Sequence, residues 1–305
     1  MINRVPFYLI TGFLGSGKTT LIKHFIRSFA DAKKIAIIQN EFAEVNIDGR
    51  ELMQTGKSFE LLEINNGSVF CVCLLGSFVH SLTDFILKHQ PDMVILEASG
   101  LSDPISIGQI ISSSPLRNFV WLAHTYTVID ALNFHKTIER VGRNLHQIRV
   151  ADTIVLNKCE LADNQLGDIM GKLKGINPFA KISETSFCDI ELNQVTKFRL
   201  PVSIVENEPH ESSGRPDLCT VIIKSSKVIA LRNLEQFIRK YSSVTYRIKG
   251  YVVTTSCVTA VQTSFGQIGL QPVANLHYPT EIVLIGPEID QKSVQQEFEN
   301  LCSLN

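Results

Sequence analysis

The first two thirds of the chain alternate short apolar runs with amphipathic stretches. The apolar runs predict β-strands at residues 7–11, 34–39, 93–97, 126–130, 153–157 and 181–185. Between them, apolar side chains recur at the spacing of one helix face, first at Leu21, Ile22, Phe25, Ile26 and Phe29 and later at Phe78, Leu82, Phe85 and Ile86. Mostly apolar strands separated by helices are typical of a mainly parallel sheet flanked by helices. We therefore predict an α/β fold for this part.

The pattern changes after residues 206–217, a polar stretch with two prolines and a glycine that is typical of a linker. Beyond it, strands are predicted at residues 220–224, 245–254, 257–263, 268–273 and 281–285, and helices at residues 231–241 and 291–302. Successive strands joined by short turns indicate an antiparallel sheet. The predicted organisation is a domain over residues 1–205, the linker, and a smaller α+β domain over residues 218–305.

Composition and charge narrow the classes of function. A chain of 305 residues suggests about two domains, and 29 basic against 30 acidic residues leave no excess for binding nucleic acid or an anionic membrane. Seven cysteines, an odd number, argue against a disulfide framework and for a reducing compartment. No apolar run approaches the ~20 residues of a membrane span, and glycines and Lys18 interrupt the early apolar stretch that could suggest a signal peptide. We predict a cytoplasmic protein.

The sequence G-F-L-G-S-G-K-T at residues 12–19 lies between the first predicted strand and the first predicted helix. This is the strand–loop–helix context of a phosphate-binding loop. Glycines let backbone N–H groups point at phosphate oxygens, and the helix directs the positive end of its dipole to the same anion. Lys18 then reaches the outer phosphates, and the Thr19 hydroxyl ligates Mg²⁺. We predict a nucleoside triphosphate site formed by Gly12, Gly15, Ser16, Gly17, Lys18, Thr19 and Thr20.

Two acidic positions complete the predicted phosphate chemistry. Glu97 ends an apolar strand, where it could hold Mg²⁺ directly or through water, and Gly100 could offer its N–H to the γ-phosphate. Residues 40–44 follow the second strand, in a region that can sense the γ-phosphate by becoming ordered. Glu41 there could orient metal or water together with Lys18 and Glu97. The alternative, an ordinary solvated loop acid, stays open for Glu41.

The sequence Asn157-Lys158-Cys159-Glu160 follows another apolar strand and is similar to the N-K-x-D element of GTPases. The acid of that element accepts hydrogen bonds from guanine N1–H and the exocyclic amine. Adenine lacks this donor pair, so an acid left unpaired would reject it. In this chain the acid is Glu160, which is one methylene longer than aspartate and weakens the guanine assignment without removing it. We predict guanine contacts from Asn157, Lys158 and Glu160; an exposed loop with incidental charges is the alternative.

With these motifs the chain resembles the CobW-like metal-chaperone GTPases, relatives of UreG and HypB. The resemblance covers nearly the whole length, through residues 10–19, 40–42, 48–49, 97–104, 127–130, 147–158, 246–250 and 281–286. Several motifs in the right order make it more specific than the phosphate loop alone. It implies GTP binding, slow Mg²⁺-dependent hydrolysis and nucleotide-dependent delivery of a metal to a client protein. The family spans several metals, including cobalt and zinc, and the oligomeric state, a homodimer included, is left open.

The chain departs from the family at its cysteine motif. The family usually carries Asn-Gly followed by C-x-C-C, whereas Asn66-Gly67 is followed here by S-V-F-C-V-C, which leaves Cys71 and Cys73. Thiolates suit Zn²⁺ and other borderline ions such as Co²⁺, and a tetrahedral site needs four ligands. If the segment is a strand, residues two apart point the same way and could ligate together, with Glu41 as a third ligand. Burial as two small hydrophobic side chains is the alternative.

Three hypotheses follow for the function. The leading one is a GTP-driven metallochaperone or cofactor-assembly GTPase. A small-molecule kinase could use the same phosphate loop and Glu97, although it would have no need of a guanine-reading element at Asn157 and Lys158. The third is a non-catalytic, nucleotide-gated module whose second domain binds a protein partner, if the altered cysteines no longer deliver metal.

Overall fold

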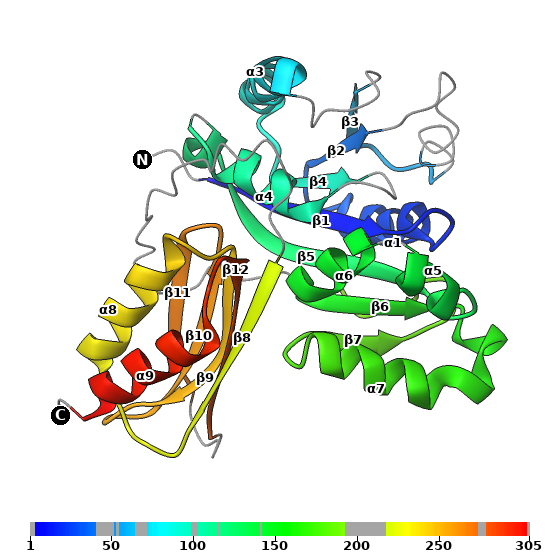
Figure 1. Ribbon diagram of the computed structural model, residues 1–305. Coiled ribbons are helices and arrows are strands. Elements are labelled where there is room, and N and C mark those ends of the chain that lie inside the picture. Colours follow the sequence, from blue (N-terminus) through cyan, green and yellow to red (C-terminus); the bar gives the residue numbers. More distant parts are fainter. Residues whose placement is uncertain are drawn as a thin grey trace. The chain divides into compact units, whose positions relative to one another are not determined.

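The computed structural model describes residues 4–40, 52, 55–64, 72–98, 103–114, 116–140, 142–192, 218–273 and 279–303 (Figure 1). The chain divides into two compact units, Met1–Val195 and Thr196–Asn305, each with its own sheet. The predicted end of the first domain and the predicted linker fall within residues 193–217, outside the described part of the chain.

The sheet of the first unit contains seven strands among the described residues, in the order β3-β2-β4-β1-β5-β6-β7. Every neighbouring pair is parallel. The strands are β1 (Val5–Gly12), β2 (Ile35–Asn40), β3 (Glu60–Ile64), β4 (Met93–Glu97), β5 (Val120–Asp130), β6 (Thr153–Asn157) and β7 (Lys181–Glu184). The predicted parallel sheet and its six strands are confirmed. The structure adds β3, and β5 begins at Val120, earlier than the predicted residue 126.

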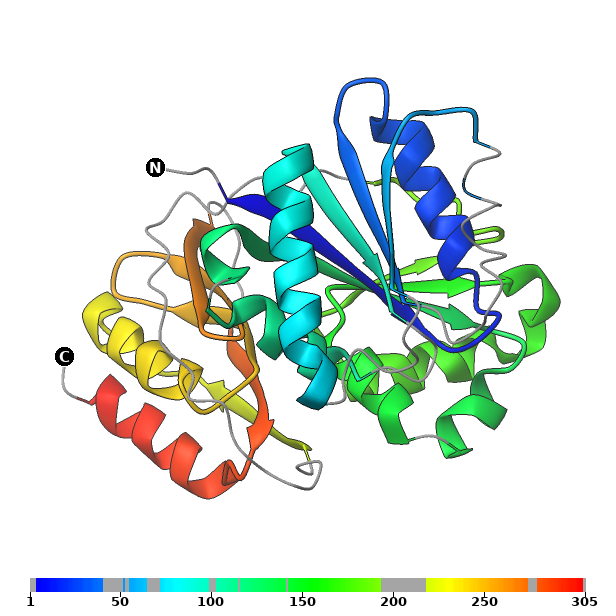
Figure 2. The ribbon, with the colours of Figure 1, turned by 90° about the horizontal axis from the view of Figure 1, so that it is seen from above.

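Helices cover both faces of this sheet (Figure 2). They are α1 (Lys18–Phe29), α3 (Val72–His89), α4 (Pro104–Ser112), α5 (Phe134–Arg140), α6 (Gly142–Val150) and α7 (Leu166–Ile176). The side chains of β6 alternate between the two layers. Val155 packs in the cluster that contains Phe25 of α1, whereas Leu156 packs with Leu173 of α7. Because strand side chains alternate in direction, each face of the sheet buries its own apolar layer.

The packing of α1 fixes the position of the loop that precedes it. Leu21, Ile22, Phe25 and Ile26 form the predicted apolar stripe and are buried. The ring of Phe25 meets Tyr126 of β5 edge-on, with centroids 5.4 Å apart. Burial of each such side chain stabilises the fold by about 1.5–3 kcal/mol. The first turn of α1 is therefore held firmly against the carboxyl ends of the central strands.

The second unit is an antiparallel sheet of five described strands, in the order β11-β10-β9-β12-β8. These are β8 (Leu218–Ser225), β9 (Arg247–Val253), β10 (Val258–Ser264), β11 (Gln267–Val273) and β12 (Thr280–Pro287), with helices α8 (Leu231–Ser242) and α9 (Gln291–Cys302). Phe237 of α8 and Phe298 of α9 meet edge-on in its core, with ring centroids 5.3 Å apart. The predicted α+β class is confirmed.

Gly250 of β9 lies between β10 and β12 with φ at +151°. A Cβ there would overlap the carbonyl oxygen of Glu281 and lie 2.7 Å from Cα of Ile282, and neither backbone atom can move aside. We expect Gly250→Ala to lower the free energy of unfolding by about 3 kcal/mol, through strain and overpacking. Urea denaturation measures this. Gly175→Ala in α7, where a Cβ meets nothing within 4 Å, is the control; equal effects of the two substitutions would contradict the steric argument.

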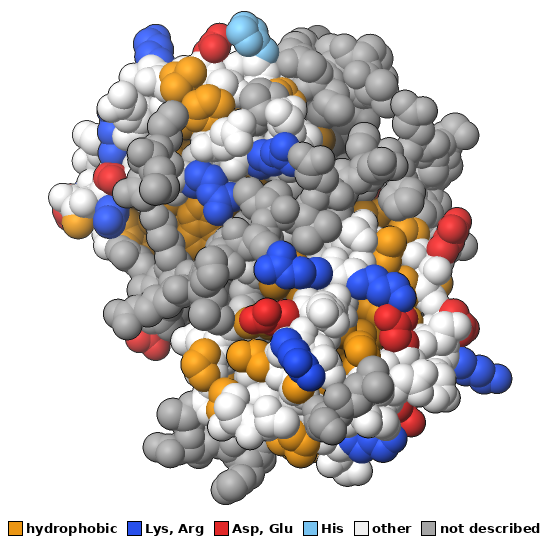
Figure 3. All heavy atoms as spheres, turned by 90° about the vertical axis from the view of Figure 1, so that its left-hand side faces the viewer, with side chains coloured by type: hydrophobic (Ala, Val, Ile, Leu, Met, Phe, Trp, Pro, Cys, Tyr) orange, Lys and Arg blue, Asp and Glu red, His pale blue; other side chains and the backbone are white. Residues whose placement is uncertain are grey.

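Figure 3 shows basic, acidic and uncharged side chains of the described residues interspersed with one another. This agrees with the near balance of 29 basic and 30 acidic residues along the chain. In the part of the chain that the structure describes, no helix combines the length and apolar character needed to cross a bilayer.

Candidate nucleotide site

The loop at residues 12–19 joins the end of β1 to the start of α1. At two of its glycines, neighbouring atoms lie so close that a side chain would not fit. Gly12 has φ of +142°, and a Cβ there would overlap the carbonyl oxygen of Val128 on β5. Gly17 has φ of +111°, and a Cβ there would lie 2.5 Å from Nδ2 of Asn157. Only glycine fits both positions, since both the space and the backbone conformation exclude a side chain.

Lys18 lies across this loop, with its side chain buried. Its ammonium group donates hydrogen bonds to the carbonyl oxygens of Gly12, at 3.0 Å, and Phe13, at 3.2 Å. The Ser16 hydroxyl is buried and has no partner among the described residues. The start of α1 has no side-chain cap, so its first N–H groups keep their capacity to bind an anion. A buried cation, an unpaired hydroxyl and an uncapped helix start fit a phosphate group.

A second cluster of polar side chains lies where β4 and β2 end. The Thr19 hydroxyl donates to Oε1 of Glu97 at 3.0 Å, and the Gln39 side-chain amide donates to Oε2 of the same carboxylate, also at 3.0 Å. Glu97 is only 7 % exposed. A hydroxyl and a carboxylate are the hard oxygen ligands that Mg²⁺ prefers, so Thr19 and Glu97 fit the predicted ion. The sequence analysis missed Gln39. Its position at the end of a predicted strand could have indicated that it lies near the site.

Asn157 and Lys158 hold the phosphate loop from the end of β6. The Asn157 amide donates to the carbonyl of Ser16 at 2.9 Å, and the Lys158 ammonium group donates to the carbonyl of Gly15 at 2.8 Å. Lys158 also pairs with Asp130 at 2.7 Å. Burial alone would raise the pKa of Asp130, but hydrogen bonds from Lys158 and Asn133 outweigh it and hold that pKa below its usual value. Because the pKa is lowered, the pair is intact at neutral pH and is lost only as the pH falls below about 4.

Residues 185–189 follow β7, and we call this segment the β7 loop. It contacts Glu160, Asn157 and α1. The Ser186 hydroxyl donates to Oε2 of Glu160, which fixes one oxygen of that exposed carboxylate. The backbone N–H of Cys188 donates to Oδ1 of Asn157 at 3.0 Å. His24 of α1 bonds the carbonyl of Phe187 at 3.0 Å. Sequence reasoning did not select this loop, because nothing in its residue types alone indicates contact with a phosphate loop.

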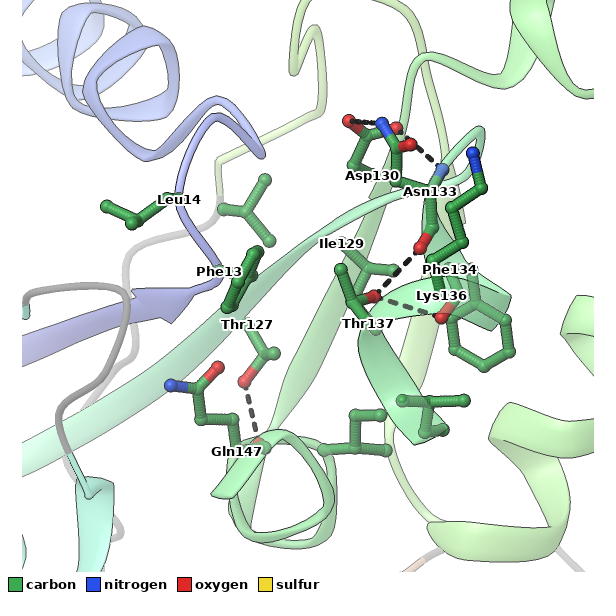
Figure 4. Close-up of a pocket in the computed structure, with 13 residues that line it drawn as sticks. Phe13, Leu14, Thr127, Ile129, Asp130, Asn133, Phe134, Lys136, Thr137 and Gln147 are labelled. Carbon is green, nitrogen blue, oxygen red and sulfur yellow. Dashed lines mark hydrogen bonds between the residues drawn. The ribbon is translucent and has the colours of Figure 1, made fainter. Parts of the chain in front are cut away.

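A pocket of about 320 Å³ lies beside the phosphate loop, and Figure 4 shows it between Phe13 and the α5 residue Thr137. Several of its polar groups are engaged with one another. Asn133 donates to Asp130, and the Thr137 hydroxyl donates to the carbonyls of Asn133 and Phe134. Much of the remaining lining is aliphatic, from β5, α5 and α6, and Lys136 adds a second charged side chain. The pocket therefore borders the site through Asp130, which pairs with Lys158.

Three predicted site residues, Glu41, Cys71 and Gly100, lie outside the described residues. Thr20 is described and lies, partly buried, in the first turn of α1. Joint ligation by the two cysteines was considered for the case that their segment is a strand; in the structure α3 begins at Val72 and includes Cys73. No group of three or more metal-binding side chains occurs among the described residues.

A parallel sheet whose first strand leads into a glycine loop and a helix, with a buried lysine across the loop, defines the P-loop class of nucleotide-binding proteins. Residues 6–184 match the family described as CobW/HypB/UreG, nucleotide-binding domain, and residues 218–302 match the cobalamin synthesis protein cobW C-terminal domain. The chain belongs to the CobW/HypB/UreG family, which confirms the resemblance found in the sequence.

Three of the proteins that are similar to this chain have names that describe a function. A zinc-regulated GTPase metalloprotein activator of Dictyostelium discoideum is 27% identical over 63% of this chain and 48% of its own length. The zinc chaperone YeiR of Escherichia coli is 35% identical over 50% of this chain and 46% of its own. The crystal structure of Zn(II)-bound YjiA GTPase from E. coli has a TM-score of 0.64 at 20% identity, over 98% of this chain and 99% of that one, which shows a shared fold. The chain spans about half the length of the first two relatives.

Proposed function

We propose that this protein binds GTP with Mg²⁺ at the phosphate loop and hydrolyses it slowly. The observation that carries the proposal is a pair of hydrogen bonds, from Asn157 to the carbonyl of Ser16 and from Lys158 to the carbonyl of Gly15. These bonds hold the end of β6 next to the phosphate loop, so one ligand can contact both. Glu160 follows two residues later with one oxygen held by Ser186. A small-molecule kinase has no need of such an element.

In the proposed complex Lys18 exchanges its loop carbonyls for the outer phosphate oxygens, and the loop N–H groups surround the remaining charge. Thr19 and Glu97 would hold the metal, because their oxygens already meet at 3.0 Å. When bound, Mg²⁺ neutralises charge on the outer phosphates. Slow turnover is expected because the sequence offers no identifiable arginine finger. Glu41 and Gly100 keep their predicted roles toward water and the γ-phosphate.

Isothermal titration of the whole chain with a non-hydrolysable GTP analogue and with its adenine counterpart tests this proposal directly. We expect saturable binding of the guanine compound in the presence of Mg²⁺ and much weaker binding of the adenine compound. Equal affinity for the two would contradict the guanine assignment. The lack of any saturation with either would contradict nucleotide binding itself.

Glu160→Gln should remove the preference for guanine. A carboxamide can no longer accept both hydrogens from guanine N1–H and the exocyclic amine, whereas its N–H can donate to the extra carbonyl of xanthine. We expect GTP affinity to fall at least about tenfold and XTP affinity to rise, since one such bond contributes about 1.5–3 kcal/mol. Competition against a fluorescent nucleotide measures both. Glu184→Gln, an exposed acid at the end of β7, is the control and should change neither affinity.

We further propose that the cargo metal is zinc and that a client protein receives it. The names of the relatives, which are zinc chaperones and zinc-regulated activators, favour zinc over cobalt. Cys71, Cys73 and Glu41 stay the proposed ligands, because thiolates suit this ion. Equilibrium dialysis with Zn²⁺, with and without the GTP analogue, should give a stoichiometry that falls in Cys71→Ser and Cys73→Ser. Binding that is independent of both thiols in every nucleotide state would exclude this site.

A further inference from the structure

A closed ring of hydrogen bonds joins the phosphate loop to the β7 loop through two side chains. The Asn157 amide donates to the Ser16 carbonyl, and its oxygen accepts from the backbone N–H of Cys188. The Cys188 thiol then donates to the carbonyl of Gly17 at 3.4 Å, which returns to the phosphate loop. Cys188 is fully buried at this junction. A displacement of either loop would break at least one of these bonds.

The β7 loop adopts an unfavourable backbone to make these contacts. Phe187 and Cys188 have φ of 55° and 56°, the left-handed region that residues with side chains rarely adopt. The Thr185 hydroxyl, which donates to the carbonyl of Asp189 at 2.9 Å, closes the turn. Strain of this kind persists where the surroundings hold it, often at functional sites. In this loop it places the thiol of Cys188 against the carbonyl of Gly17 and the N–H of Cys188 against the side chain of Asn157.

The thiol is suited to act as a neutral donor. Burial raises the pKa of Cys188 to about 12, against the opposing charge of Lys158. The group therefore stays protonated at neutral pH and adds no negative charge beside a triphosphate. The sulfur lies close to the backbone of Gly17, because a Cβ added there would be 3.0 Å from it.

We propose that Cys188 is a positioning residue for the nucleotide site: its thiol holds the carbonyl of Gly17, directly before Lys18, so that the β7 loop and the phosphate loop close together on one nucleotide. The inference rests on the proposed nucleotide function of this loop. Cys188 bonds Asn157 and Gly17 and would contact no reacting atom of the nucleotide. Its loss should therefore weaken the binding of ground state and transition state alike, so KM rises and kcat is unchanged.

The test compares Cys188→Ala, Cys188→Ser and Cys302→Ala by titration with the GTP analogue and by GTPase kinetics. Cys302, a buried thiol of α9, is the matched control. We expect Cys188→Ala to lose up to about tenfold in affinity, the effect of one hydrogen bond. Cys188→Ser keeps a donor and should recover most of the loss, and Cys302→Ala should bind as the wild type does. Wild-type affinity in Cys188→Ala, or a serine variant no better than the alanine variant, would overturn the proposal.

Amide hydrogen exchange of the nucleotide-free proteins separates this inference from the proposed function. The amides of residues 16–19 should exchange faster in Cys188→Ala than in the wild type and in Cys302→Ala. If the wild type fails to bind either purine triphosphate, the proposed function is wrong, and the exchange data still decide whether Cys188 restrains the loop. Unchanged exchange at residues 16–19 would refute the positioning role, whatever the nucleotide result.

Discussion

Lys18→Met should reduce triphosphate binding by at least about a hundredfold. The ammonium group already lies across the phosphate loop, bonded to the carbonyls of Gly12 and Phe13. In the complex those bonds give way to bonds with phosphate oxygens, and each bond to a charged partner contributes about 1.5–3 kcal/mol. Two of them give at least about 3 kcal/mol, and 1.4 kcal/mol corresponds to a factor of ten. Calorimetric titration with the GTP analogue and Mg²⁺ measures the loss.

Methionine keeps much of the volume of the lysine stem, so the effect should not come from a cavity. Arg27→Met is the matched control, because Arg27 is an exposed cation on the same helix. It should bind nucleotide as the wild type does. Thermal unfolding of both variants checks that the first unit stays folded. Tight triphosphate binding by folded Lys18→Met would remove Lys18 from the site and, with it, the phosphate-loop assignment.

Asn157→Ala should weaken both the fold and the nucleotide site. The side chain is almost fully buried and serves two loops at once, as a donor to the Ser16 carbonyl and an acceptor from the Cys188 amide. Its removal leaves a buried carbonyl and a buried N–H without partners, each costing about 1–3 kcal/mol. We expect the free energy of unfolding to fall by about 4 kcal/mol and GTP affinity to fall at least tenfold. Urea denaturation and titration measure the two effects.

Asn177 provides a control of the same chemistry. It is another buried asparagine, whose amide donates to the carbonyls of Ile148, Arg149 and Ala151 at the end of α6. Asn177→Ala should therefore cost a similar amount of stability and leave nucleotide affinity unchanged in the folded protein. Asn157→Asp keeps the size and the acceptor but loses the donor to Ser16 and brings a buried negative charge against that carbonyl, so it should lower both stability and affinity. Equal losses of affinity in the Asn157 and Asn177 variants would assign the effect to general destabilisation.

The parts of the site that are local in sequence were predictable. The phosphate loop is eight consecutive residues between a strand and a helix, and the glycine requirement at positions 12 and 17 has a local sequence signature. Glu97 was found because parallel strands bring their carboxyl ends to one edge of the sheet, and Asn157 was found through its similarity to the N-K-x-D element of GTPases. The strand β3 was missed because its five residues, E-L-L-E-I, are too short and too mixed to show a period.

The contacts that join distant loops were not predictable. Cys188 and Gly17 are 171 residues apart, and a thiol in a loop has no local pattern that indicates a hydrogen bond to a backbone carbonyl. Gln39 was passed over because glutamine is common at strand ends, and only the register between β2 and β4 places it opposite Glu97. The start of α3 at Val72 was not predicted, because C-V-C is compatible with either a strand or the start of a helix. Only tertiary context decides between those two.

The hydrogen bonds from Lys158 and Asn157 to the carbonyls of the phosphate loop have a consequence for the cost of binding. They order the loop within the folded chain, so a ligand that fits the loop does not bear the entropy of ordering it. Under the proposed function, more of the attraction between the loop and the phosphates then appears as affinity.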